Sequence, residues 1–411
     1  MTKKIVITGI GATSPLGGTA ADSWSALLAG ASGASNLEQA WVAETALPIT
    51  FAAQAKVPSS SVLERHEIKR LDPSSQFALI AGREAWADAG APGVDPERLA
   101  VDWSTGIGGV WTLLDAWDTL RERGPRRVLP MTVPMLMPNG PGAAIGMDLH
   151  ARAGIRTVVS ACASSTEALA NAYSHLQQGL ADVIIAGGSE AAIHPLPIAS
   201  FAAMQALSKR NDDPTTASRP YDITRDGFVL GEGAAALVVE TEEHAKARGA
   251  RIYAELLGGS VTSDAHHITA PDPEGSAAAR AMITAIRNAG AELKDVAHIN
   301  AHATSTPVGD IAEYNALRRV FGDLLDGIPV SATKASTGHL LGGAGAIEAL
   351  FTVMALAERT APPTINLTEQ DPAIALDVVT TPRPLPSGDL LAISNSFGFG
   401  GHNAVVAFRS V

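Results

Sequence analysis

VVSACASSTEALANA, residues 158–172, contains Cys162, the only cysteine of the 411-residue chain. The apolar run RTVVSA (156–161) predicts a buried strand, and the apolar positions 169, 172, 173 and 176 after it recur at helical spacing. Gly179 stands where a helix commonly ends. We therefore expect Cys162 at a strand-to-helix turn, where unpaired N–H groups and the helix dipole lower a thiol pKa and favour the thiolate.

A lone cysteine is more often a small buried core residue than a reactive one. Around Cys162, however, Ala161, Ala163, Ser164 and Ser165 are small enough to let a substrate approach. The turn and its small neighbours together favour a nucleophile that forms a covalent intermediate.

Apolar runs alternate with helical patterns along most of the chain. Helical periodicity covers 75–90 and 276–290, and the alternation predicts an α/β protein whose sheets are covered on both faces. The other candidate strands are KIVITG (4–9), DVIIAGG (182–188), AALVVE (235–240), AHINA (297–301), PVSAT (329–333), LLAISNS (390–396) and AVVAF (404–408).

A weak internal repeat indicates two similar halves. PVSATKASTGHLLGGAGAIEALFTVMALAERT (329–360) repeats the order strand, small-residue turn and helix found around Cys162, and it shares VSA at the strand end. We expect one half over 1–250 with the cysteine and a second over 251–411 with the histidines discussed below. No Pro/Ser-rich or charged linker separates them, so intimate packing is expected.

Composition excludes several classes of protein. Hydrophobic residues form 46% and charged residues 18% of the chain, which is typical of a large globular core, and a net charge of −12 argues against nucleic-acid binding. One cysteine excludes an internal disulfide framework, and MTKKIVITGIG lacks a signal peptide's apolar core, so we expect a cytoplasmic protein. The apolar run 340–356 contains Glu348 and is short for a membrane span; we interpret it as a buried helix.

Two histidines follow predicted strands, as Cys162 does. They are His302 in NAHATSTPVGD and His339 in TKASTGHLLGG. Either alone would more often be structural, but ligands of α/β sheets bind at the carboxyl ends of strands. A further strand end, SNSFGFGGHN (394–403), has glycines suited to a loop whose N–H groups approach a substrate.

Two other motifs are weak. TGIGATSPLGG (8–18) has Ser14 where a dinucleotide loop needs its third glycine. His266 and His267 have no carboxylate or cysteine cluster beside them, so we expect a loop at the cleft or surface rather than a metal site.

The chain resembles the β-ketoacyl-[acyl-carrier-protein] synthases over residues 4–408, in motifs that keep their order. These are SACASSTEALANA, SRPYDITRDGFVLGEGAAALVVE (218–240), NAHATSTPVGD, KASTGHLLGGAGAIEA and NSFGFGGHN. Within that family it is most similar to the elongating condensing enzymes of bacterial fatty acid synthesis, of actinobacterial type. The resemblance implies a thiolase-like fold, a five-layer αβαβα sandwich of two duplicated halves, and a homodimer.

The resemblance also implies roles for single residues. Cys162 is the nucleophile of a Cys-His-His set with His302 and His339, Lys334 is the motif lysine, and Glu348 is its expected ion-pair partner. The other matched positions are the N–H groups of Cys162 and Phe399 in an oxyanion hole, Ile107, Phe397 and Phe399 at the gate of the acyl pocket, and Thr304 and Thr306 on the pantetheine arm.

Two positions depart from the family pattern. Ala303 stands where many members have glycine, and His402 stands where many have threonine. No role is assigned to His402.

The implied reaction is a decarboxylative Claisen condensation. An acyl chain held on the phosphopantetheine of an acyl carrier protein passes to Cys162, malonyl carrier protein loses CO2, and the carbanion attacks the acyl-cysteine. The β-ketoacyl product is two carbons longer. Neutral His302 and His339 are expected to donate hydrogen bonds to the enolate, and neither a metal nor a redox cofactor is needed.

Four other functions must be weighed against an elongating fatty acid synthase, and the sequence argues against three of them. A thiolase would need a second cysteine as base, and an initiating synthase would have asparagine in place of His339. An elongating ketosynthase of a polyketide or polyene pathway shares the same chemistry. A non-catalytic chain-length partner subunit would lack Cys162.

Carrier proteins are acidic, so an acidic chain needs local basic patches to bind one. The patches that match the family's docking sites are Arg65, Lys69 and Arg70, then Arg126 and Arg127, and a further contribution from Lys209 and Arg210.

Overall fold

The computed structural model describes residues 3–411. Ten strands form one continuous sheet made of two five-stranded parts that meet where β1 pairs with β8 through Ile5–Ile7. In sheet order the strands are β10 (Val330–Ser331), β9 (Val296–Asn300), β13 (Leu391–Gly398), β14 (His402–Arg409), β8 (Ala254–Ser263), β1 (Ile5–Thr13), β7 (Gly233–Thr241), β6 (Val183–Glu190), β4 (Leu99–Ser104) and β5 (Gly154–Arg156).

The two parts of the sheet have the same pairing pattern. β5, β4 and β6 are parallel, and β7 and β1 follow in antiparallel pairings; β10, β9 and β13 are parallel, and β14 and β8 follow in the same way. The duplicated α/β architecture expected from the sequence is therefore present. The exact division near residue 250 stays a proposal.

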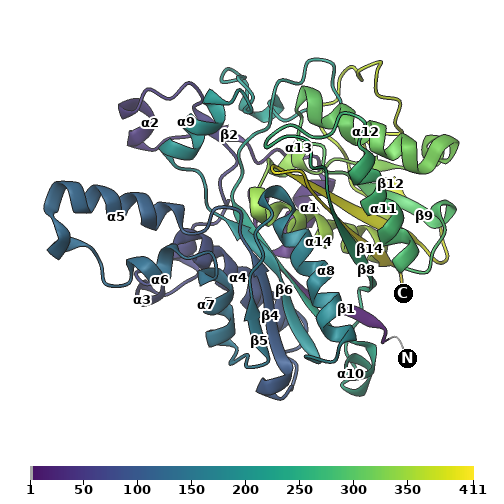
Figure 1. Cartoon of the computed structure of the whole chain (residues 1–411), viewed down its shortest axis with the longest axis horizontal. Helices are drawn as coiled ribbons and strands as arrows, with labels where there is room; N and C mark the ends of the chain where they lie inside the picture. The colour runs from purple at the N-terminus through teal and green to yellow at the C-terminus, as the bar shows by residue number, and fades with distance from the viewer. Residues whose placement is uncertain (1–2) are drawn as a thin grey trace.

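Helices complete five layers (Figure 1). α8 (Ser164–Gln177) and α14 (Ala344–Ala357) contact strands of both parts of the sheet and form the central layer. α4 (Pro73–Asp88) and α7 (Gly140–Asp148) cover the first part from outside, and α11 (Ser276–Asn288), beside α12 (Pro307–Phe321), covers the second. The remaining helices and strands are α1 (Ala20–Leu28), α2 (Ala40–Glu44), α3 (Arg65–Ile68), α5 (Val110–Arg123), α6 (Thr132–Leu136), α9 (Pro195–Ala203), α10 (Glu242–Ala247), α13 (Lys334–Thr337), β2 (Ser35–Asn36), β3 (Phe51–Ala52), β11 (Thr360–Ala361) and β12 (Arg383–Pro384).

α14 is the buried helix predicted over 340–356. It is apolar on all sides, as expected for a helix with protein around it, and almost every residue is buried. Its N-terminus crosses that of α8 so closely that a Cβ on Gly345 would lie 2.0 Å from Oγ1 of Thr166. The two central helices thus bring the strand ends that precede them to one place.

The predicted strand over 156–161 is wrong in its extent. β5 ends at Arg156, and residues 157–160 pair with no strand in the described part of the chain. Residues 157–160 have the apolar pattern of a strand, but they follow β5, the edge strand of the sheet. Among residues 3–411, no strand lies on the outer side of β5 to extend the hydrogen-bonded ladder over them.

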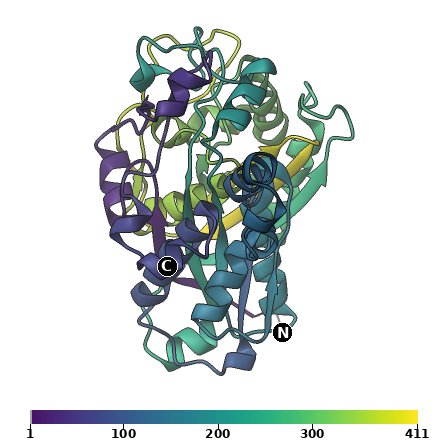
Figure 2. The same ribbon diagram turned by 90° about the vertical axis from the view of Figure 1, so that its left-hand side faces the viewer.

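α5 and α6 form an arm that projects from the sandwich (Figures 1 and 2). In Figure 2 α5 points toward the viewer and is seen nearly end-on. Leu113, Trp117 and Leu120 of α5 are exposed along it. No helix within residues 3–411 is long and apolar enough to cross a membrane.

Candidate active site

Cys162 lies in a short 3-10 turn, η4 (Ala161–Ala163), that leads directly into α8. Ala161 has a φ of 50°, a left-handed conformation that is unusual for a residue with a side chain and that often marks functional sites. The Ser164 hydroxyl holds the turn, because it accepts from Ser160 N (2.9 Å) and donates to Ala161 O (2.6 Å). The predicted turn is confirmed.

The glycine-rich loop is the hairpin between β13 and β14, and it packs against the cysteine turn. A Cβ on Gly398 would lie 2.6 Å from Ser160 O and 3.0 Å from Cys162 N, so only glycine fits there. The backbone N–H groups of Phe399 and Cys162 both reach the thiol. The oxyanion hole made of these two N–H groups stays a prediction.

The expectation that the turn lowers the thiol pKa is wrong for the free protein. Burial raises the pKa of Cys162 to about 11 and outweighs the opposing effects of the Lys334 charge and of the Phe399 N–H. The resting side chain is therefore a neutral thiol at pH 7.

Lys334 joins His302 to Glu348 in a buried cluster. The Lys334 ammonium donates to His302 O (2.6 Å), to His302 Nδ1 (3.3 Å) and to the Glu348 carboxylate. Since an ammonium only donates, Nδ1 of His302 accepts and its hydrogen sits on Nε2. Burial raises the pKa of Glu348, and the ammonium opposes that shift.

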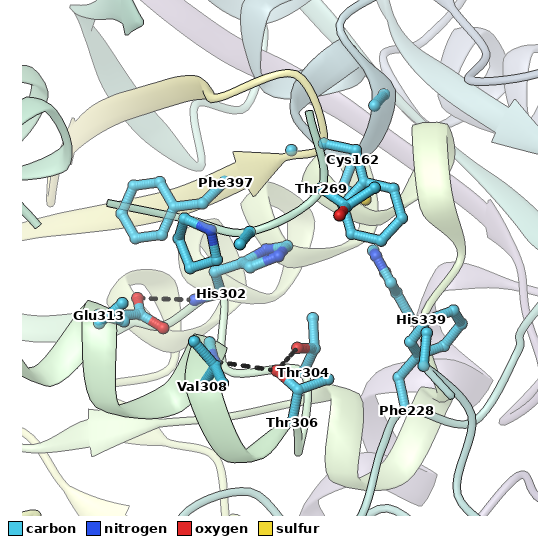
Figure 3. A pocket seen from close by; sticks show the side chains of 18 of the residues that line it. Cys162, Phe228, Thr269, His302, Thr304, Thr306, Val308, Glu313, His339 and Phe397 are labelled. Atoms are coloured by element: carbon cyan, nitrogen blue, oxygen red, sulfur yellow. Dashed lines mark hydrogen bonds between the residues drawn. The ribbon is translucent and has the colours of Figure 1, made fainter. Parts of the chain in front are cut away.

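His339 lies opposite His302, with ring centroids 5.5 Å apart and rings nearly perpendicular. Figure 3 shows both imidazoles directed into the cavity that Cys162 lines. Burial holds the pKa of both well below 6.5, and the Lys334 charge adds to this, so both rings are neutral. Neither ring nitrogen of His339 has a hydrogen-bond partner within residues 3–411, which leaves both available to a substrate.

Glu313 of α12 holds the His302 segment and was missed in the sequence analysis. Its carboxylate accepts from His302 N (2.9 Å), Ala303 N (2.7 Å) and Asn395 Nδ2 (3.1 Å). Asp310 and Glu313 lie one helical turn apart on the buried face of α12. The signal available in the sequence was two acids at that spacing, just after the start of a helix that begins with a proline.

A cavity of about 580 Å³ connects these residues and opens outward (Figure 3). Ile107, Phe397 and Phe399 line it, as do Thr304 and Thr306. Thr306 Oγ1 accepts from Gly309 N (3.2 Å) and caps α12, and it lies 3.0 Å from Thr304 Oγ1. The structure thus gathers the predicted gate and pantetheine residues in one cavity.

The predicted docking residues are spread over three surface segments. Arg65 lies on α3, with Lys69 and Arg70 just after it, and Arg126 and Arg127 lie in the 3-10 turn η3 (Pro125–Arg127) that follows α5 at the end of the arm. All five are exposed, as is Lys209, and none forms an ion pair with another described residue. Arg210 is half-buried and donates to Thr216 Oγ1 (3.0 Å).

His402 begins β14 and pairs with Gly398 across the hairpin. Its ring lies next to Gly400, and nothing in the structure assigns it a chemical task. His266 and His267 are exposed in the loop after β8, part of which lines the cavity. Within residues 3–411 no group of His, Cys, Asp and Glu side chains is arranged to hold a metal ion.

A thiolase-like sandwich with a cysteine and two histidines in one cavity defines a condensing acyltransferase. Residues 2–245 match the N-terminal domain of β-ketoacyl synthases, and residues 253–368 match the C-terminal domain of the same enzymes. The chain belongs to the β-ketoacyl synthase family.

Relatives and solved structures agree with this assignment. The chain is 45% identical to 3-oxoacyl-[acyl-carrier-protein] synthase 2 of Mycobacterium tuberculosis H37Rv over 405 residues, covering 98% of this chain and 96% of the relative. It is 43% identical to the enzyme of the same name from Staphylococcus aureus N315, covering 99% and 98%.

The structure of AntDE:AntF, a type II polyketide ketosynthase with its acyl-carrier protein, superimposes with a TM-score of 0.92 at 31% identity and full coverage of both chains. The ishigamide ketosynthase/chain length factor gives 0.91 at 28%, again with full coverage. The predicted thiolase-like fold is confirmed.

Proposed function

We propose that the protein elongates acyl chains on an acyl carrier protein by decarboxylative condensation with malonyl carrier protein. The observation that carries the proposal is the cavity itself, where Cys162, two neutral imidazoles and two inward N–H groups meet. The higher identity to the 3-oxoacyl synthases than to the polyketide ketosynthases supports fatty acid elongation.

In the first half-reaction, the sulfur of Cys162 attacks the acyl thioester and the pantetheine thiol leaves. The thiol is neutral at rest, so its proton leaves the sulfur as the bond forms and passes to the departing pantetheine sulfur. The N–H groups of Cys162 and Phe399 stabilise the tetrahedral oxyanion.

In the second half-reaction, malonyl carrier protein loses CO2 and its thioester oxygen becomes an enolate. Nε2–H of His302, fixed by the Lys334 contact to Nδ1, and a ring N–H of His339 donate to that oxygen. The carbanion then attacks the acyl carbonyl on Cys162, and the Cys162 thiolate leaves. The thioester is the electron sink, so the reaction requires neither metal nor redox cofactor.

The test compares carrier proteins from a fatty acid system and a polyketide system side by side. The purified protein receives acyl carrier and malonyl carrier, and mass spectrometry follows the products. We expect a β-ketoacyl product two carbons longer, formed faster on the fatty acid carrier. Absence of any β-ketoacyl product with both carriers contradicts the proposal.

We propose that the carrier protein binds at the exposed basic residues of the arm and of α3. Arg126→Glu with Arg127→Glu should raise KM for carrier-bound substrates by about threefold to tenfold and leave a short pantetheine thioester unaffected. The matched control is Arg280→Glu with Arg287→Glu, which makes the same charge change on the exposed face of α11. Equal KM values in both variants contradict this docking site.

We propose that two copies of the chain pair along the β5 edge. Beyond β5 the sheet has no further strand among residues 3–411, and the apolar side chains of Met147, Ile155 and Val159 are 69%, 39% and 49% exposed there. The hydroxyl of Thr157 is buried beneath this edge with no partner in the described structure. Ile155→Lys with Val159→Lys should halve the mass measured by sedimentation; a monomeric wild type contradicts the proposal.

A further inference from the structure

Glu190, at the end of β6, is a buried carboxylate that the condensation does not use. Burial raises its pKa to about 7. Its oxygens accept four hydrogen bonds from two separate turns: from Thr105 Oγ1 (2.9 Å), Gly106 N (2.8 Å), Ile107 N (3.3 Å) and Gly342 N (3.0 Å). A buried carboxylate is costly unless its oxygens are satisfied, and here both are.

The two turns form neighbouring parts of the cavity wall. The turn after β4 carries Ile107, and the 3-10 turn η8 (Leu341–Gly343) before α14 carries Leu341; both side chains line the cavity. The backbones touch, since a Cβ on Gly342 would lie 2.0 Å from Gly106 N. Among residues 3–411, Glu190 is the one residue whose side chain binds both backbones at this contact.

We propose that Glu190 is a positioning residue that fixes the Ile107 turn against the Leu341–Gly343 turn and thereby sets the enzyme's discrimination among acyl chain lengths. The inference rests on the proposed function, because it needs Ile107 to contact the acyl chain. Glu190 itself touches no reacting atom.

The acceptor capacity of the two carboxyl oxygens is essential to this role. All four partners are donors, so a carboxylate satisfies them all, whereas a glutamine turns an NH2 group toward at least one N–H. The Ile107 turn then loses its fixed position. His339 is held independently, through His339 N to Val229 O (2.7 Å) and Gly231 N to His339 O (2.9 Å), so the imidazole stays in place.

The experiment measures kcat and KM for Glu190→Gln with a series of saturated acyl pantetheine thioesters from short to long. We expect the ratio of kcat/KM between the best and worst chain lengths to fall by about tenfold. Malonyl decarboxylation should stay within about twofold of wild type, a result that general loosening of the site would not give. Glu190→Asp keeps the carboxyl group, so its ratio of kcat/KM values should lie between those of wild type and Glu190→Gln.

Glu232→Gln is the matched control. Burial also raises the pKa of Glu232 to about 7, but it accepts a single N–H, from Ala55 (3.2 Å), and does not line the cavity. Its chain-length profile should equal that of wild type. If Glu190→Gln does not fold, Thr105→Val removes one bond to the carboxylate and should flatten the profile in the same direction.

An unchanged profile in folded Glu190→Gln, or in Thr105→Val where the first variant does not fold, overturns the inference. So does an equal fall in decarboxylation and in long-chain condensation. Failure of the proposed function is distinguishable, because wild type itself would then give no condensation.

Discussion

The turn before α8 and the turn before α14 have the same backbone shape but different contents. Each is a 3-10 turn that begins with a left-handed residue, Ala161 at φ 50° in one and Leu341 at φ 46° in the other. Each starts a central helix that follows the equivalent edge strand, β5 or β10. Cys162 and Gly342 therefore occupy matching positions.

The difference lies in what the backbone N–H of each turn binds. In the first turn the Cys162 N–H, together with that of Phe399, is directed at the thiol and remains available to a reacting oxyanion. In the second turn the Gly342 N–H is bound by the Glu190 carboxylate. The duplicated fold thus supplies two turns with an inward N–H group, and the Glu190 carboxylate binds one of them.

The largest expected effect is on the rate of condensation, when the first turn loses its nucleophile and so resembles the second. Cys162→Ala should reduce condensation by about 10⁴- to 10⁶-fold, because no other thiol exists to carry the acyl group. Mass spectrometry after incubation with labelled acyl carrier protein locates the label. Label retained at the wild-type level in the variant contradicts the role of Cys162.

His339 lies between β10 and the second turn, on a stretch with α13 that the first half lacks. His339→Ala, and likewise His302→Ala, should slow malonyl decarboxylation by about 10²- to 10³-fold and slow acyl transfer much less. Stopped-flow acylation and CO2 release measure the two steps separately. Equal losses in both steps, with folding intact, would remove this division of labour.

The second turn should not tolerate a side chain at the position where the first turn carries one. Gly342→Ala places a methyl group 2.0 Å from Gly106 N and should lower the free energy of unfolding by about 1–3 kcal/mol. Gly343→Ala, whose nearest contact would be 3.3 Å, is the matched control. Identical urea midpoints for both variants would show that the two turns are equally permissive.

The last prediction concerns the pH dependence of the Cys162 thiol. With a pKa of about 11, Cys162 should react with iodoacetamide about ten times faster for each pH unit gained between pH 7 and pH 10. The sign follows from burial, which favours the neutral thiol and so raises the pKa. A reaction rate that levels off below pH 8 would mean that the helix N-terminus lowers the thiol pKa by more than burial raises it.

Strong local patterns carried most of the fold prediction. The Cys162 turn, the buried helix α14 and the glycine hairpin were predictable because small residues and apolar periodicity dictate them locally. The VSA repeat indicated the duplication but in the wrong register. It aligns Ala161 with Ala332, whereas the left-handed residue of the second turn is Leu341.

The features that could not be predicted from the sequence depend on contacts between distant segments of the chain. The end of β5 at Arg156 depends on an edge that periodicity does not reveal. The raised pKa of Cys162 follows from burial, which outweighs the local N–H groups. Glu190 and Glu313 look like ordinary acids in the sequence, and their tasks appear when backbone N–H groups far along the chain surround them.

The position of β1 has a consequence for how the chain is made. β1 is synthesised first, yet it lies in the middle of the sheet and pairs with β7 and β8, up to Leu256. Translation adds about 5–20 residues per second, so roughly 10–50 s pass before these partner strands have been synthesised. During that time the apolar side chains of β1 have no strand to pack beside. A nascent chain that ends before β8 leaves one edge of β1 bare, so Ile5–Thr13 is open to pairing with other chains in the interval between synthesis and folding.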